Sequence, residues 1–195
     1  MKFYESGDNR KPVIFLFPGT CCQYSSFDHV LDGLHSYFYT VAVSYDGFDP
    51  NEKTEFYSME DECEKIEQEI RTKYGGRIKA AYGCSLGGSF VSLLIQRKRI
   101  HIDYGIIGSS DMDEAGNLVA KIQASMVVPF MYKMIHTGAL PKFMQKKLNK
   151  TDGAKKELYN GFLNMFGIGK GGSPWITKQS IYNCLLYTSD AADEA

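Results

Sequence analysis

The first part of the chain alternates between short apolar runs and longer segments with apolar residues at helical spacing. Continuous apolar runs of this length are typical of strands that are buried on both faces of a parallel sheet. One such run occupies 13–17 (VIFLF). Further strands are predicted at 39–45 (YTVAVSY), 78–82 (IKAAY) and 102–108 (IDYGIIG), and 2–5 (KFYE) is predicted to be an edge strand.

Three helices are predicted between these strands. The first covers about 25–38, and the third, 86–96, is apolar almost all round, which predicts a buried helix. Ser58 can cap the start of the second helix, and Gly75 can end it in a left-handed conformation. The acidic first turn of this helix is interpreted as a solvated face rather than a metal site. Alternating strands and helices predict an α/β fold with a mostly parallel sheet and helices on both faces.

After Asp113 the alternation stops, and the sequence to about Asn183 shows only helix-like, methionine-rich segments. We expect three parts: residues 1–113 as the sheet-containing core, 114–183 as a helical cap inserted over the sheet, and 184–195 as a tail that does not belong to the natural protein.

Composition and charge narrow the functional classes. The chain has 195 residues, 44% of them hydrophobic, and a net charge of −1 from 22 Lys+Arg and 23 Asp+Glu. This balance predicts no nucleic-acid partner and no membrane partner, and no apolar run approaches the length of a membrane span. The 5 cysteines lack metal-site spacing and are expected to be reduced, buried thiols of a cytoplasmic protein. No cofactor or metal is implied, and the oligomeric state stays open.

The segment GCSLG places Ser85 between Gly83 and Gly87 in the pattern G-x-S-x-G, directly between a predicted strand and a predicted helix. This is the setting of a nucleophile elbow, a strained turn that needs small neighbours. The alternative is a glycine-rich turn that serves only packing or phosphate binding.

The segment FPGT follows the strand 13–17. Acyl transfer needs two backbone N–H groups aimed at the developing oxyanion, one after the nucleophile and one from a loop after an earlier strand. Leu86 and Thr20 are the candidates for these two donors. A plain Pro-Gly turn is the alternative for FPGT.

Together these motifs resemble the α/β-hydrolase family over roughly residues 1–183. KPVIFLFPGT is similar to its strand and oxyanion loop, with Pro18 where histidine is usual, and VSYDGFDP to its D-x-x-G segment, although Gly47 follows Asp46 at once. The resemblance implies an incomplete α/β-hydrolase core with a helical cap. A serine at the elbow is similar to the esterase and lipase branches rather than to branches that carry aspartate there.

The family's triad runs in the order Ser, acid, His, and none of the four histidines has the expected position. His29 and His35 precede Ser85, His101 falls at the opposite edge of the sheet, and His136 falls in the cap. Asp111, just past the strand 102–108, is a possible acid, and Asp113 is a weaker one.

The C-terminal run CLLYTSDAADE, 184–194, resembles a translated sequencing adaptor. We therefore expect the last strands, the main acid and the histidine to be missing. The strand 102–108 would then lack its next neighbour, and residues 184–195 would pack against nothing specific.

The sequence thus predicts a serine hydrolase that cleaves a small or medium carboxylic ester through an acyl-enzyme, inactive in this form, with a small-molecule ester or acyl substrate. The alternatives are a thioesterase, an acyltransferase or a carbon–carbon hydrolase on the same fold, or a non-catalytic ligand-binding protein. Lysines clustered in the cap could attract an anionic substrate, although a solvated helix face is the favoured explanation: Lys142, Lys146, Lys147, Lys150, Lys155 and Lys156.

Overall fold

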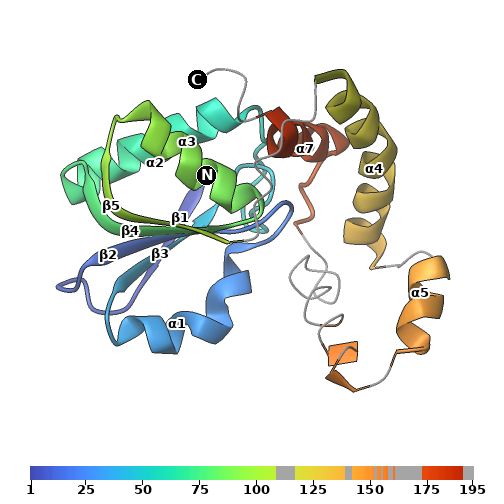
Figure 1. Ribbon diagram of the computed structural model, residues 1–195, viewed down its shortest axis with the longest axis horizontal. Helices are drawn as coiled ribbons and strands as arrows, with labels where there is room; N and C mark the ends of the chain where they lie inside the picture. Colours follow the sequence, from blue (N-terminus) through green and yellow to red (C-terminus); the bar gives the residue numbers. More distant parts are fainter. Residues whose placement is uncertain are drawn as a thin grey trace.

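A computed structural model describes residues 1–108, 117–138, 142–151, 153–154, 156–157, 160 and 173–190. Its centre is a five-stranded sheet in the order β1-β3-β2-β4-β5 (Figure 1). Only β1 runs antiparallel to its neighbour; the other pairs are parallel. The strands are β1 (Lys2–Ser6), β2 (Val13–Phe17), β3 (Tyr39–Ser44), β4 (Arg77–Cys84) and β5 (His101–Gly108). All five predicted strands and the mostly parallel sheet are confirmed.

Helices cover both faces of this sheet, as predicted (Figure 1). The short η1 (Tyr24–Phe27) and α1 (Asp28–His35) lie on one face, over a small apolar cluster that includes Ile14 and Leu16. The other face carries α2 (Met59–Tyr74) and α3 (Leu86–Arg97), which enclose the main core around Phe15, Phe17 and Phe90.

Helix α2 is capped at both ends by the residues that the sequence predicts. The Ser58 hydroxyl accepts a hydrogen bond from the amide of Asp61 (3.1 Å), and Gly75 ends the helix with φ 63°. The predicted inner face is buried: Met59, Cys63, Ile66 and Ile70.

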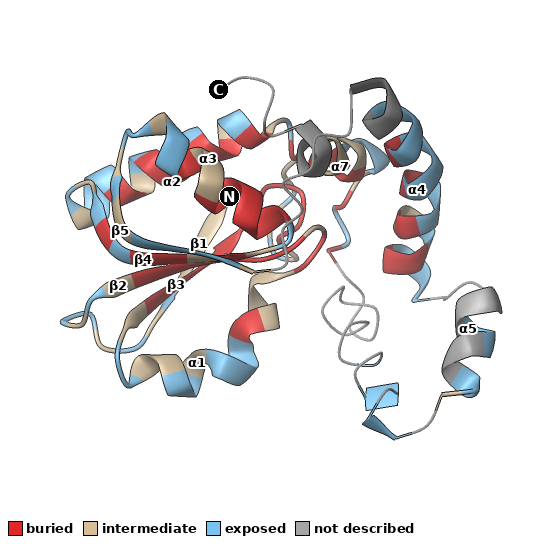
Figure 2. Ribbon diagram, viewed as in Figure 1, coloured by how far each residue is buried: buried red, intermediate tan, exposed pale blue. Residues whose placement is uncertain are grey.

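The described part of the chain after β5 is helical: α4 (Asn117–Thr137), α5 (Lys142–Asn149) and α7 (Lys178–Asp190). Helix α7 contacts both α4 and α3, and its Ile181 and Cys184 belong to the main core. Figure 2 shows the buried side of α4 turned toward α7. No helix among the described residues is long and apolar enough to span a membrane.

Two sequence expectations about burial need correction. Residues 184–195 were expected to pack against nothing specific, but Cys184 is fully buried and Leu185 packs against the core, because α7 continues to Asp190. Helix α3 is not buried all round, since Ile95 is 46% exposed on the side that faces solvent.

Strand β5 is paired on one side only, with β4, in the part of the chain that the structure describes. The expectation that this strand lacks its next neighbour is therefore confirmed for the described residues. Its side chains are accordingly open to solvent, with Tyr104 60% and Ile106 48% exposed.

Candidate active site

Ser85 lies in the turn between β4 and α3, at the carboxyl edge of the sheet. Its backbone has φ 53° and ψ −121°, a conformation that non-glycine residues rarely adopt. The residue is exposed, whereas Leu86 behind it is fully buried. The strain therefore holds the serine hydroxyl at the surface while the start of α3 is anchored in the core, as the elbow motif predicts.

The two glycines of the motif are required by close backbone contacts. A Cβ on Gly83 would lie 2.0 Å from the carbonyl oxygen of Gly87, and a Cβ on Gly87 would lie 2.1 Å from the carbonyl oxygen of Phe17. Both distances are far below any real contact, so β4, α3 and the end of β2 can approach this closely only without side chains.

The loop after β2 lies directly against the elbow. A Cβ on Gly19 would stand 3.5 Å from the Cβ of Ser85, and the amide of Cys22 donates to the carbonyl of Gly19 (3.0 Å) to close the turn. The buried Tyr45 hydroxyl donates to the carbonyl of Pro18 (3.1 Å) and fixes the start of the loop. The sequence-predicted partners Ser85, Leu86 and Thr20 are thus carried by two segments in contact.

Cys184 of α7 lies close to Thr20 and Cys21 of this loop. Burial raises the pKa of its thiol to about 12, and this outweighs the opposite effect of the nearby Thr20 side chain and Cys21 amide. Such a thiol stays protonated and unreactive near neutral pH. Sequence reasoning missed the role of Tyr45 in holding the loop, because this contact joins residues far apart in the chain.

None of the four histidines is hydrogen-bonded to Ser85. His35 shares hydrogen bonds with Ser6 (2.9 Å) and Thr40 (3.1 Å), and His136 bonds to the carbonyl of Tyr132 (3.0 Å). His101 pairs in register with Arg77 at the start of β4, seven residues before the strand end that carries Cys84. Its ring lies 3.1 Å from Asp103, at the opposite edge of the sheet from the elbow. Asp111 and Asp113, the candidate acids, lie outside the described residues.

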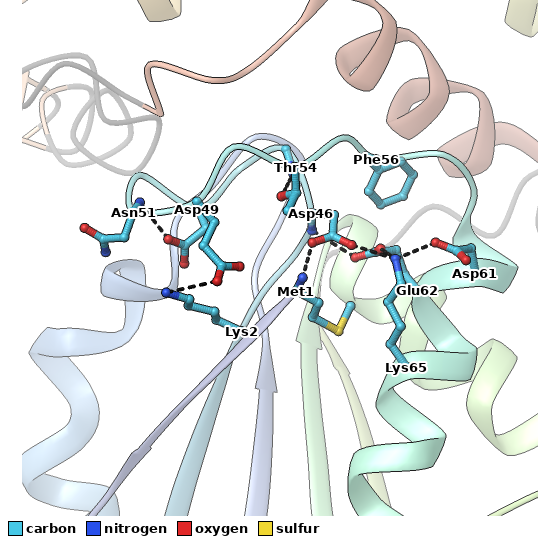
Figure 3. A network of polar contacts seen from close by, with 12 residues as sticks. Met1, Lys2, Asp46, Asp49, Asn51, Thr54, Phe56, Asp61, Glu62 and Lys65 are labelled. Atoms are coloured by element: carbon cyan, nitrogen blue, oxygen red, sulfur yellow. Dashed lines mark hydrogen bonds and ion pairs between the residues drawn. The ribbon is translucent and has the colours of Figure 1, made fainter.

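A second polar group lies beside the site, on the loop after β3 and the first turns of α2 (Figure 3). Glu62 accepts from the amide of Asp46 (3.0 Å), and its carboxylate is fully buried. The interpretation of this acidic turn as a solvated face is therefore wrong for Glu62, because the side chain turns inward toward the β3 loop.

These carboxylates surround an ammonium group. The Lys65 Nζ donates to Asp46 (2.6 Å), Asp61 (2.5 Å) and Glu62 (2.9 Å), and the amino terminus of Met1 also bonds to Asp46 (Figure 3). Oxygens of the three carboxylates lie within 4.8 Å of one another, a spacing that could hold a metal ion. Since lysine already supplies the positive charge at their centre, the group is an ion-pair network rather than a metal site.

Burial and neighbouring charges shift the titration of this network. Burial together with the negative charge of Asp46 raises the pKa of Glu62. Burial also acts to raise the pKa of Asp46, but its bonds to Lys65 and the amino terminus outweigh this and lower it. The proton thus belongs on Glu62 before Asp46.

No protein-family model and no curated protein sequence matches the chain. Solved structures do. A protein of Desulfitobacterium hafniense assigned to the alpha/beta hydrolase family aligns with a TM-score of 0.71 at 16% identity, over 97% of this chain and 72% of that chain.

Two similar structures are esterases. For a carboxylesterase of Nitrososphaera gargenis the TM-score is 0.68 at 17% identity, over 96% of this chain and 68% of that one. A thermophilic esterase of Thermogutta terrifontis aligns with a TM-score of 0.69 at 15% identity, over 98% of this chain and 68% of that chain. The chain therefore has the α/β-hydrolase fold, in an incomplete form that lacks part of what these longer structures contain.

Proposed function

We propose that this chain belongs to a serine hydrolase that cleaves a carboxylic ester through an acyl-enzyme, with Ser85 as nucleophile. The observation that carries the proposal is the exposed Ser85 at φ 53°, held by glycine contacts between β4, α3 and β2. Strain of this kind persists only where the surrounding structure enforces it, and it concentrates at active sites. The esterases among the similar structures support the choice of an ester as substrate.

The reaction follows from these positions. The Ser85 oxygen attacks the ester carbonyl carbon while a base takes its proton, and the carbonyl oxygen becomes an oxyanion. The amides of Thr20 and Leu86 would stabilise that charge. The leaving alcohol departs with the proton from the base, and water then repeats the sequence on the acyl-serine to release the acid and free Ser85.

The base is not one of this chain's histidines in their present positions. We propose that it comes from the part of the fold that this chain does not span, since the similar structures are longer. The 195-residue chain should then hydrolyse p-nitrophenyl butyrate with essentially no dependence on Ser85. Serine-dependent turnover above about 1 s⁻¹, an ordinary enzyme rate, would place a base within the chain, with His136 and Asp111 as the first pair to substitute.

A cysteine at the elbow tests the site without a base, because a thiol is partly ionised near neutral pH and strongly nucleophilic. The Ser85→Cys variant should be acylated by p-nitrophenyl butyrate, with one butyryl group found on that residue by mass spectrometry. The matched control is Ser125→Cys, since Ser125 is also exposed but lies on α4, away from the elbow.

Working oxyanion donors should make acylation at position 85 about 100-fold faster than at position 125, compared per thiolate. Equal acylation rates at the two positions would contradict a catalytic role for the elbow and favour the non-catalytic ligand-binding alternative.

A further inference from the structure

Helix α4 carries apolar side chains on two opposite faces. One face packs on α7 and is buried, with Ala124, Val128, Met131 and Ile135. The opposite face, which we call the outer stripe, consists of Ile122, Met126, Pro129 and Phe130 and is exposed (Figure 2). Met126 is 75% and Ile122 is 53% exposed. These positions recur at helical spacing, so they form one continuous strip rather than scattered surface residues.

The charged residues in the sequence of α4 and α5 are all of one sign. From Asn117 to Thr151 the sequence contains no aspartate or glutamate, although the whole chain has a net charge of −1. Its charged residues are lysines alone: Lys121, Lys133, Lys142, Lys146, Lys147 and Lys150. Lys133 lies on the same side of α4 as Met126 and Phe130, and it is exposed.

Helix α5 extends this basic region. Its exposed lysines, Lys142 and Lys146, lie one helical turn apart, and Lys150 follows one turn later, just past the helix end. Figure 1 shows α5 beyond α4, at the end of the molecule that is farthest from the sheet. The cap therefore presents an apolar strip and a group of lysines away from the core.

An occupant of this surface must offer apolar contact and negative charge together. A second copy of the chain docked through the same surface would bring the lysines of both copies together, and that repulsion opposes it. A surface of anionic lipid supplies both features, because exposed apolar side chains enter the acyl boundary while lysines meet the headgroups.

We propose that the cap binds an anionic lipid surface through the outer stripe of α4, with the lysines of α4 and α5 against the headgroups. The helices lie on this surface and do not span it. The net charge of the whole chain predicts no membrane partner, and the inference rests instead on how charge is distributed locally. It is independent of the proposed chemistry at Ser85.

Sedimentation with vesicles tests the proposal, using the 195-residue chain and vesicles of phosphatidylcholine with and without phosphatidylglycerol. Binding is expected only to the anionic vesicles and should weaken as salt is added. Each lysine near such a surface contributes roughly a fivefold increase in partitioning. Lys146→Gln should therefore bind about fivefold more weakly, and the triple change of Lys142, Lys146 and Lys150 to Gln about 100-fold more weakly.

Matched controls separate this surface from general stickiness. Lys98→Gln removes an exposed lysine on the sheet side and should leave binding unchanged. Met126→Gln should weaken binding, whereas Tyr37→Gln, at a side chain 72% exposed in the loop before β3, should not. Unchanged thermal melting would show that Met126→Gln is folded, and Ser85→Ala should bind like the unaltered chain.

Several outcomes would overturn the proposal. These are equal binding to neutral and anionic vesicles, no binding to either, or equal effects of the cap and control substitutions. Self-association in size-exclusion chromatography that Met126→Gln abolishes would assign the stripe to a second copy instead. Capture of an acidic protein without any binding to anionic vesicles would likewise replace the lipid by a protein partner.

Discussion

The amide of Ser85 donates a hydrogen bond to the carbonyl of Gly108, the last residue of the neighbouring strand β5 (2.9 Å). The candidate nucleophile is therefore tied directly to the edge strand of the sheet. On its other side, Gly87 lies directly against the backbone of Phe17, an approach that is possible only because glycine has no side chain. The turn is clamped between the ends of β2 and β5, and this explains how its strained backbone is maintained.

Gly87→Ala should destabilise the fold strongly, because the new Cβ would lie 2.1 Å from the backbone oxygen of Phe17 and neither group is a flexible side-chain end. A loss of about 3 kcal/mol in the free energy of unfolding is expected, at the upper end of overpacking effects. Urea denaturation measures it. The control is Gly33→Ala on α1, where a Cβ meets nothing within 4 Å, and a gain of about 0.5–1 kcal/mol is expected. Similar effects at both positions would contradict the close contact at the elbow.

Glu62 should make stability fall as pH rises through the weakly acidic range. Burial and Asp46 raise its pKa in the folded state from 4.5 to about 7. Between these values the unfolded chain releases the proton while the folded chain keeps it, so the free energy of unfolding decreases as pH rises. Below about 4.5 and above about 7 this contribution no longer changes.

Thermal melting from pH 4 to pH 8 measures this effect against two variants. Glu62→Gln should lack the decrease between about pH 5 and 7 that the unaltered chain shows. Glu60→Gln changes the charge by the same amount at an exposed position of the same helical turn, and it should keep the decrease. Parallel curves for all three proteins would show that Glu62 does not hold a proton in the folded state.

Deleting residues 184–195 should lower the melting temperature by several degrees, because the deletion removes the fully buried Cys184 and the packing of Leu185 on the core. The shorter deletion of 191–195 removes no described residue and serves as the control. The adaptor-like sequence alone predicts no change for either deletion. Equal melting of all three proteins would support that interpretation of the tail and contradict the packing of α7.

The strands and the elbow could be predicted from the sequence because their signals are local. An apolar run such as 13–17 shows a buried strand within five residues, and the glycines around Ser85 lie next to it in the chain. Capping of α2 by Ser58 and Gly75 is local in the same sense. These features depend on nearest neighbours, which a sequence displays directly.

The burial of Glu62 and Cys184 could not be predicted in this way. Each depends on residues from other elements: Glu62 bonds to Asp46 on the loop after β3, and Cys184 packs in the core cluster that contains Phe15 and Phe90. An acidic first turn has the same sequence pattern whether it faces water or another carboxylate. An adaptor-like sequence likewise does not show that a helix continues through part of it, or that its Cys184 is buried in the core.

The position of α7 also bears on how the molecule comes apart. Ile176, Ile181 and Cys184 share one buried cluster with Phe15 of β2 and Phe90 of α3, and Val128, Met131 and Ile135 of α4 belong to the same cluster. A cap that shares few contacts with the sheet could melt separately, but unfolding of α7 here would expose the main hydrophobic core to solvent. Helices α4 and α7 and the sheet should therefore lose structure in a single cooperative transition, without a stable intermediate in which only the sheet remains folded.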